Sequence, residues 1–197
     1  MTLRAIKAVP SAKNLTWACD TVLTLSKGDY IALLGKSVTV RIGYIDLVTV
    51  QELEDMTSVG MSFMPVTYAL EFDPAHTLAR LAALGLPKGV TVWLDVEGVN
   101  LEPMTLIAKI NVWANAVVSA GYEAGIYVGA GCPLTSTQLT WLAVSRYWHS
   151  CSRALEPERG YCVRQLRPND VTVCNRDLDM DVIEPDYHGD LPTVAAA

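Results

Sequence analysis

Charge is scarce in this sequence, and positive charge is scarcer than negative charge. Only 18% of the 197 residues are charged, and 15 Lys and Arg stand against 21 Asp and Glu, which gives a formal net charge of −6. A protein that binds nucleic acid by releasing counterions needs a basic face, so we expect no nucleic-acid partner. Hydrophobic residues make up 51% of the chain, which excludes intrinsic disorder because so much apolar surface can be buried.

Long hydrophobic runs are also missing. No run reaches the roughly 18 apolar residues needed to cross a bilayer, so we expect no membrane span. The most apolar long segment, 104–120, contains Lys109, Asn111 and Asn115 and is interpreted as a buried helix. The N-terminus lacks the apolar stretch of a signal peptide, which predicts synthesis in the cytoplasm. Later release to the cell wall or extracellular space, from a phage or a bacterium, stays open.

Signatures of metal and nucleophile chemistry are absent as well. Five cysteines form no C-x-x-C pair, and the three histidines form no zinc-binding set. There is no G-x-S-x-G elbow. The pair Gly129 and Gly131 lacks the third glycine of a dinucleotide fingerprint. We therefore expect reduced thiols, no metal and no cofactor.

The chain does contain an alternation of strand-like and helix-like segments, which predicts a mainly parallel sheet. Strands are expected at 16–22, 37–42, 62–68, 90–96, 124–128, 145–149, 161–166 and 178–183, and helices at 49–59, 74–85, 103–120 and around 137–143. About eight strands favour a compact α/β fold, a (β/α)₈ TIM-type barrel whose late helices are short or missing. A doubly wound open sheet is the alternative. We predict one barrel domain over 1–197, with its core at about 16–183 and a tail at 184–197.

A pair of carboxylates at the end of the fourth predicted strand is the strongest chemical signal. Residues i and i+2 of a strand point to the same face, so Asp95 and Glu97 project together, and Gly98 ends the run. Parallel barrels build their active sites at this end of the strands. Two close carboxylates cannot both ionise freely, so the pKa of one should rise, as a general acid requires. Ordinary loop carboxylates that cap the following turn would show the same pattern.

Other acids and aromatic residues also lie at the ends of predicted strands or, for Asp179 and Asp181, within the eighth one. They are Asp20, Glu71, Asp179 and Asp181 among the acids, and Tyr68, Trp93, Tyr127, Tyr147 and Trp148 among the aromatics. A barrel would bring these ends to one rim and form an acidic pocket. Aromatic faces suit sugar rings, although Trp93 and Tyr127 fit a buried core equally well.

The order of these segments resembles a known family. VWLDVEG (92–98), GYEAGIYVG (121–129), SRYWHS (145–150), VRQL (163–166), DMDVI (179–183) and ACDT (18–21) resemble the glycoside-hydrolase-like family called domain of unknown function 1906. More distantly, they are similar to the lysozymes of glycoside hydrolase family 25. The resemblance covers roughly 16–183. The sequence departs from the family at Ala18, Cys19 and Asp181, which stand where a glycine, an apolar residue and an asparagine are usual.

The resemblance implies a barrel that hydrolyses N-acetylated sugars, most simply peptidoglycan. Glu97 would then be the general acid, and Asp95 would stabilise positive charge or orient the acetamido group. Asp20 and Asp179 would complete the acidic rim, while Gln165 and Trp148 would line the sugar subsite. We add Tyr68, Tyr127 and Glu71 as substrate-binding candidates and expect a monomer.

Two questions stay open at this point. The α-carbons of Asp95 and Glu97 should lie ~6.6 Å apart, which decides neither the ~5–5.5 Å carboxyl spacing of retaining enzymes nor the ~6.5–9.5 Å of inverting ones. Substrate assistance by the acetamido oxygen is a third mechanism. The second question is catalysis itself, because a non-catalytic carbohydrate-binding or structural module could use the same barrel.

Overall fold

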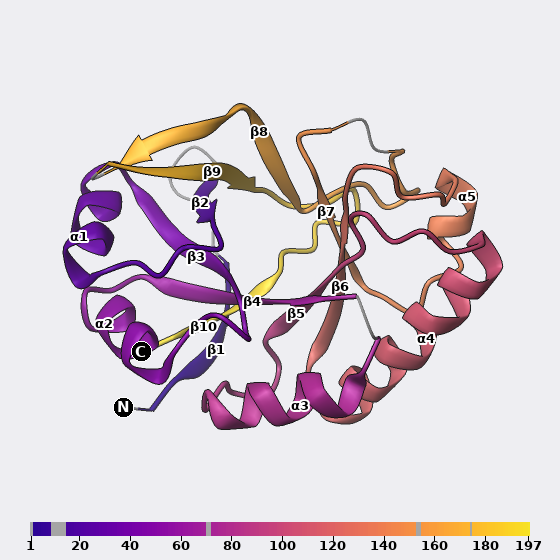
Figure 1. The fold of residues 1–197 in the computed structure, drawn as a ribbon, viewed down its shortest axis with the longest axis horizontal. Coiled ribbons are helices and arrows are strands. Elements are labelled where there is room, and N and C mark those ends of the chain that lie inside the picture. The colour runs from indigo at the N-terminus through magenta and orange to yellow at the C-terminus, as the bar shows by residue number, and fades with distance from the viewer. Residues whose placement is uncertain (1, 9–14, 70–71, 153–154, 174) are drawn as a thin grey trace.

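The computed structural model describes residues 2–8, 15–69, 72–152, 155–173 and 175–197, and its centre is a closed barrel of eight strands (Figure 1). The strands follow the order β4-β3-β2-β9-β8-β7-β6-β5, and β5 pairs again with β4 to close the barrel. Their bounds are β2 (Thr16–Asp20), β3 (Val38–Tyr44), β4 (Ser62–Tyr68), β5 (Thr91–Asp95), β6 (Glu123–Val128), β7 (Arg146–His149), β8 (Val163–Val173) and β9 (Arg176–Ile183). The closed barrel confirms the predicted architecture, and the open doubly wound sheet is wrong.

Helices lie outside the strands and follow the early ones in the chain. They are α1 (Lys27–Gly35), α2 (Val50–Ser58), α3 (Pro74–Ala83), α4 (Pro103–Ser119) and the four-residue α5 (Ser136–Leu139). In the described part of the chain no helix follows β7 or β8. The prediction of short or missing late helices is confirmed. None of the described helices is long and apolar enough to cross a membrane.

Local signals explain several helix boundaries. Thr49 accepts a hydrogen bond from the Glu52 backbone at the start of α2, and Pro74 takes the first position of α3. Gly121 follows α4 with a φ of +91°, which a side chain would oppose. The prediction missed α1, whose capping box pairs Ser26 with Asp29.

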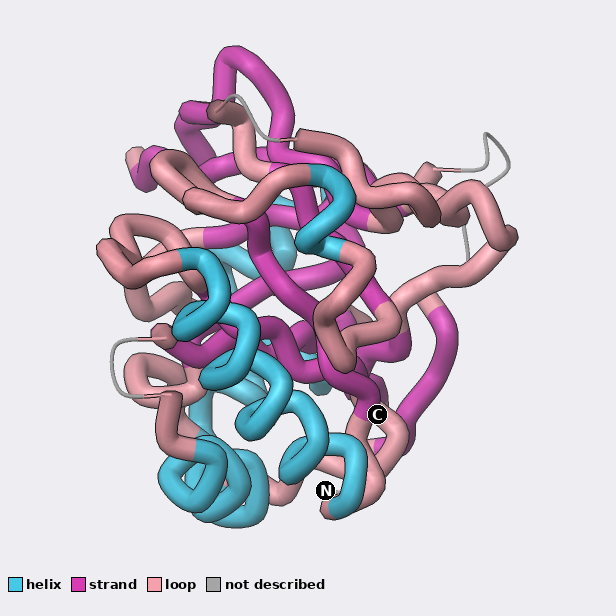
Figure 2. The backbone as a smooth tube through the Cα atoms, turned by 90° about the vertical axis from the view of Figure 1, so that its right-hand side faces the viewer, coloured by secondary structure: helices cyan, strands magenta, loops and turns pink. Residues whose placement is uncertain are grey.

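Strand β9 is the exception to the parallel pattern. It runs antiparallel to both of its neighbours, β2 and β8, whereas the other six pairings of the barrel are parallel. Its hairpin with β8 turns through Asn175, whose φ is +61°, and stands at the top of the molecule in Figure 2. The residue pattern of 178–183 does not indicate whether this strand runs parallel or antiparallel to its neighbours.

The chain ends form two short strands that the sequence analysis did not predict. β10 (Thr193–Ala196), inside the segment expected to be a tail, pairs with β1 (Arg4–Lys7) and, through Ala195, with Phe63 of β4. Pro65 lies where β4 exchanges β10 for β5, and the register between β3 and β4 is continuous through it. The proline therefore falls where β4 changes its partner, a position that suits a residue without a backbone N–H to donate.

Glu123 joins these terminal strands to the barrel. Its carboxylate lies 2.8 Å from Lys7 Nζ, accepts a 2.7 Å hydrogen bond from Thr91 Oγ1 and lies 3.7 Å from Arg146 Nη2. Burial alone would raise the pKa of Glu123, but the hydrogen bonds from Lys7 and Thr91 and the charge of Arg146 outweigh burial and lower it.

We expect Glu123→Gln to reduce the free energy of unfolding by about 1 kcal/mol at neutral pH, since the carboxylate is partly exposed. A lowered folded-state pKa stabilises the fold above the ordinary value of 4.5, and this contribution disappears as the pH falls through the folded value. Urea unfolding of both proteins near neutral pH and near pH 3 tests this. A difference that stays the same at both pH values would contradict it.

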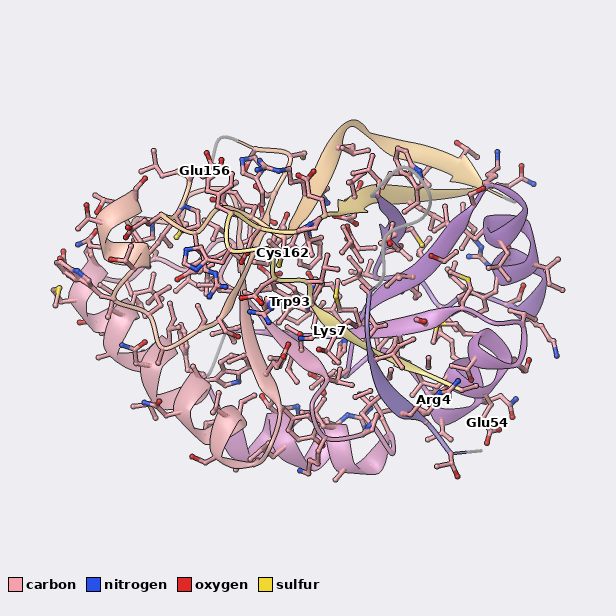
Figure 3. All side chains as sticks on the ribbon, turned by 180° about the vertical axis from the view of Figure 1, so that it is seen from behind. Arg4, Lys7, Glu54, Trp93, Glu156 and Cys162 are labelled. Atoms are coloured by element: carbon pink, nitrogen blue, oxygen red, sulfur yellow. The ribbon has the colours of Figure 1, made fainter. Side chains whose placement is uncertain are left out.

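Two apolar regions hold the structure together. The barrel interior includes Trp93, which is fully buried, and Figure 3 shows Trp93 and Cys162 in the middle of the molecule. Gly125 on β6 makes room for the indole, because a Cβ there would lie 2.6 Å from Trp93 Cε3. The second region lies between strands and helices, where Trp113 of α4 is fully buried and its Nε1 donates to Thr77.

Candidate active site

A cavity of about 270 Å³ opens where strands β2, β3, β6, β7, β8 and β9 bring their side chains together near the carboxyl ends of the parallel strands. Its lining residues are Asp20, Thr21, Val22, Tyr44, Glu97, Tyr127, Trp148, Gln165, Asp177 and Asp179. Among the residues whose side chains the structure describes, four carboxylates and no lysine or arginine line it. The cavity lies where parallel barrels place their sites, as the sequence analysis expected.

Aromatic side chains separate this cavity from the core. Trp148 contacts the edge of Trp93 with ring centroids 5.9 Å apart, and Tyr127 packs against Trp148 at 4.4 Å. Both Trp148 and Tyr127 are buried. They form a rigid apolar wall on which the polar residues of the site are arranged.

The carboxylates of the D-x-E pair take different positions. Asp95 ends β5 and is buried, and it does not line the cavity. Its Oδ1 accepts a 2.8 Å hydrogen bond from the Glu97 backbone N–H, and its Oδ2 accepts a 2.7 Å hydrogen bond from Tyr44. Asp95 thus caps the turn that carries Glu97. Glu97 is exposed, lines the cavity, and accepts a 3.0 Å hydrogen bond from the Ala130 backbone.

Asp20 and Asp179 face each other across the pairing of β2 with β9. Like charges directly opposite each other repel, and Gln165 lies between them. Its Nε2 donates to Asp20 Oδ2 at 3.1 Å and to Asp179 Oδ2 at 3.0 Å. Its Oε1 accepts from Tyr127 at 3.2 Å and from the Cys151 backbone at 3.0 Å. The amide cannot flip, because carboxylates only accept and the Cys151 N–H only donates.

Burial dominates the electrostatics of these acids. It raises the pKa of Asp20 to about 7, against the hydrogen bond with Asp181, which lowers it, and together with the charge of Asp179, which raises it further. Burial also raises the pKa of Asp95, although hydrogen bonds from the Glu97 backbone and Tyr44 oppose the rise. A raised pKa was expected on the member of the Asp95–Glu97 pair that acts as the acid, but burial raises the pKa of Asp95, the member that does not line the cavity.

Gln165→Glu is expected to destabilise the protein by more than about 2 kcal/mol at neutral pH. The new carboxylate cannot donate to Asp20 or Asp179, and it adds a third charge beside them. The loss should shrink near pH 4, where the acids take up protons. Thermal unfolding at both pH values measures it.

Gln51→Glu is the matched control. Gln51 Nε2 also donates to an aspartate, Asp55, at 3.1 Å, but on the exposed face of α2. We expect a loss below about 0.5 kcal/mol there, because solvent screens the new repulsion. Equal losses in the two variants would show that the Gln165 bridge has no special role.

The structure brings most predicted site residues together. Six of them line the cavity: Asp20, Glu97, Tyr127, Trp148, Gln165 and Asp179. Asp95 does not line it but is hydrogen-bonded to two residues that do, Tyr44 and Glu97. Tyr68 is 40% exposed and stacks on Tyr44 with ring centroids 4.0 Å apart, outside the cavity lining. Glu71 lies outside the described residues.

Several contributors to the site were not predicted from the sequence, among them Asp177, which lines the cavity from the start of β9. Tyr44 stands two residues beyond the predicted end of its strand, on the same face as Ile42, so a longer strand would have found it. Gly129 follows β6, and a Cβ there would lie 2.5 Å from Glu97 Cβ. Arg41 is buried and donates from Nη2 to the carbonyls of Thr21, at 2.7 Å, and Leu23, at 3.3 Å, fixing the loop after β2.

Metal and thiol chemistry have little support in the described part of the chain. No group of three or more His, Cys, Asp and Glu side chains there could hold a metal ion. Cys19 and Cys162 are buried thiols, and burial raises the pKa of each to about 12. Cys132 and Cys151 are half-buried, and Cys174 lies outside the described residues.

Comparison with known proteins finds similarity at the level of the fold. No family model matches the sequence, and no curated protein matches it. Among solved structures, an uncharacterised protein of B. stearothermophilus is 15% identical with a TM-score of 0.65, and the match covers 86% of this chain and 96% of that chain.

Two glycosyl hydrolases of family 25 have the same fold. The one from Streptococcus pneumoniae, described as a virulence factor that participates in host cell invasion, is 15% identical with a TM-score of 0.59, over 86% of this chain and 87% of that chain. The one from Bacillus anthracis is 11% identical with a TM-score of 0.59, over 88% and 90%. The chain therefore has a glycosidase-like barrel fold.

Proposed function

We propose that the protein is a glycosidase that hydrolyses N-acetylated cell-wall glycan, an N-acetylmuramidase of the lysozyme or endolysin type. The observation that carries the proposal is the convergence of Asp20, Glu97 and Asp179 on one open cavity walled by Tyr127 and Trp148. These carboxylates lie up to 159 residues apart in the sequence (179 − 20). The proposal includes membership of domain of unknown function 1906, on the segments quoted above.

Glu97 is the general acid in this proposal. It is the carboxylate of the D-x-E pair that lines the cavity, so a glycosidic oxygen can reach it. Asp95 acts from behind, holding the Glu97 backbone through Oδ1 and contributing negative charge near the reacting centre. Protonation of the leaving oxygen by a positioned carboxyl contributes about 10²–10⁴-fold to the rate.

Asp20 and Asp179 supply negative charge from the opposite side. Strands β5 and β9 are four places apart in the eight-strand order, so the acid and these carboxylates lie across the barrel mouth from each other. Glycoside hydrolysis passes through an oxocarbenium-like transition state, which carries positive charge. The four carboxylates that line the cavity, with no basic side chain among its described lining residues, are complementary to that charge.

The size and walls of the cavity fit one sugar residue of a longer chain. Its volume of about 270 Å³ lies just below the ~300–1,000 Å³ of typical small-molecule sites. The exposed Tyr68, stacked on Tyr44 beside the cavity, offers an aromatic face to a neighbouring sugar. A glycan lying across the mouth would use both.

The test is hydrolysis of purified peptidoglycan. We expect new reducing ends, clearing of permeabilised cells, and fragments whose reducing sugar, after borohydride reduction, is muramic acid. If the sugar at the reducing end is glucosamine instead, the protein is still a glycosidase, but the muramidase assignment is wrong.

A pull-down on insoluble peptidoglycan, run in parallel, distinguishes the glycosidase from a non-catalytic carbohydrate-binding module. Binding without new reducing ends would select a non-catalytic carbohydrate-binding module. Neither binding nor cleavage of any N-acetylated glycan would remove the proposal.

A further inference from the structure

Asp181 is a carboxyl group of the site that the glycosidase mechanism does not use. It is fully buried on β9, opposite Ala18 of β2, and it shares the inward face with Asp179 two residues earlier. Its Oδ1 accepts a 2.8 Å hydrogen bond from Trp148 Nε1. An indole N–H can only donate, so this contact fixes one oxygen of Asp181.

The second carboxylate oxygen of Asp181, Oδ2, indicates that the Asp181–Asp20 pair holds a proton. Among the described residues, Asp181 Oδ2 has no donor while both Asp181 and Asp20 are ionised. Asp181 and Asp20 lie on the same face of the paired strands β9 and β2, near enough for their carboxyls to interact, and two ionised carboxylates cannot donate to each other. A proton on either acid turns this contact into a hydrogen bond and removes a buried, unpaired charge.

The surroundings favour Asp181 as the holder of the proton. Asp20 is less buried and lines the cavity, and its charge is stabilised by Gln165 Nε2 and by the nearby Arg41. Asp181 is completely enclosed, and the Trp148 indole is its one donor among the residues that the structure describes. A negative charge is therefore better placed on Asp20.

We propose that Asp181 is a neutral carboxylic acid that donates a hydrogen bond to Asp20 and so fixes the orientation of that carboxylate in the cavity. Asp181 is a positioning residue, because it acts through Asp20 and does not line the cavity. The role of Asp20 in hydrolysis rests on the proposed function, but the protonation of Asp181 does not.

Electrostatics supports the same arrangement. Burial raises the pKa of Asp181 well above its ordinary value, and the charges of Asp20 and Asp179 raise it further. The titratable and charged groups around the pair are Asp20 and Cys19 on β2, Arg41 on β3, Tyr127 on β6 and Asp179 on β9, with the neutral donors Trp148 on β7 and Gln165 on β8.

Asp181→Asn tests the proposal, because an amide reproduces the neutral acid. Its oxygen can accept from Trp148 and its NH₂ can donate to Asp20. Infrared difference spectra between the wild type and this variant at pH 7 should show the carbonyl band of one protonated carboxyl only in the wild type. The band should persist as the pH is raised from 7 toward 9. Absence of this band would overturn the proposal.

Thermal unfolding gives a second, independent readout. An acid whose folded-state pKa is raised destabilises the fold increasingly as the pH rises above its unfolded value of about 3.9. Asp181→Asn should therefore have a higher Tm than the wild type near pH 8 and almost the same Tm near pH 4. A shift in Tm that is equal at both pH values would contradict a buried neutral acid.

Hydrolysis measurements on Asp181 variants distinguish a failure of the positioning role of Asp181 from a failure of the proposed function. We expect kcat of Asp181→Asn to stay within a few-fold of the wild type, and kcat of Asp181→Leu, which has no donor, to fall by about tenfold or more. Equal losses in the two variants would overturn the positioning role. If the wild type hydrolyses no glycan, the proposed function fails, and the infrared and unfolding experiments still decide the protonation of Asp181.

Discussion

Glu97→Gln is expected to abolish nearly all hydrolysis of cell-wall glycan while leaving the fold unchanged. A glutamine cannot release a proton to the glycosidic oxygen, so the rate of reducing-end formation should fall by about 10²–10⁴-fold. The side chain is exposed, and its hydrogen bond from the Ala130 backbone goes to an oxygen that glutamine also provides. The Tm and the binding to insoluble peptidoglycan should therefore match those of the wild type.

Glu54→Gln is the matched control for this prediction. Glu54 is also exposed, but it lies on α2, outside the cavity, and Figure 3 shows it at the outer edge of the molecule. Its hydrolysis rate should equal that of the wild type. If Glu97→Gln also clears cell walls at the wild-type rate, Glu97 is not the acid.

Gly129→Ala should disable the same site without touching a carboxylate. A Cβ at this position would lie 2.5 Å from Glu97 Cβ and 3.1 Å from Glu97 Cα. Because Glu97 Cα is backbone, no side-chain rotation relieves the overlap, and the turn that carries Glu97 must move. A displacement of about 1 Å costs a catalytic site about 10²-fold, and the crowding should lower stability by about 1–3 kcal/mol.

The measurement must distinguish a loss of activity caused by displacement of Glu97 from one caused by unfolding. Reducing-end formation is compared at a temperature well below the Tm of both proteins, so that each is fully folded. Gly35→Ala is the control, because nothing lies within 4 Å of a Cβ at that helical position. We expect normal hydrolysis and a stability equal to the wild type or higher by up to about 1 kcal/mol. Full activity of Gly129→Ala would show that the position of Glu97 tolerates this movement.

Local signals predicted a large part of the barrel. Apolar strands alternating with capped helices, such as α2 behind Thr49 and α3 behind Pro74, are set by neighbours in the sequence. The missing prediction of α1 has a physical cause as well. Gly28 and Gly35 weaken the helical pattern, and a cap at Ser26 and burial of Tyr30 and Leu33 compensate for them.

Site residues that lie close together on one strand could be predicted from the sequence, whereas contacts between different strands could not. Asp95 and Glu97 come from one strand end, and Asp20 and Asp179 follow from the order of strands in a barrel. The Gln165 bridge between the two aspartates could not be assigned from the sequence, because it requires the antiparallel pairing of β9 with β2. The need for a glycine at position 129 was also not visible in the sequence, because it comes from the backbone of Glu97, which follows a different strand.

The sequence by itself determined an α/β alternation, an acidic chain, and a D-x-E pair at a strand end, because these depend on residues close together along the chain. Only the tertiary structure decided which of the two carboxylates is buried, which acids share hydrogen bonds, and how the terminal strands β1 and β10 attach. Burial and pairing are properties of contacts between distant segments, and those contacts set the protonation of Asp20, Asp95 and Asp181.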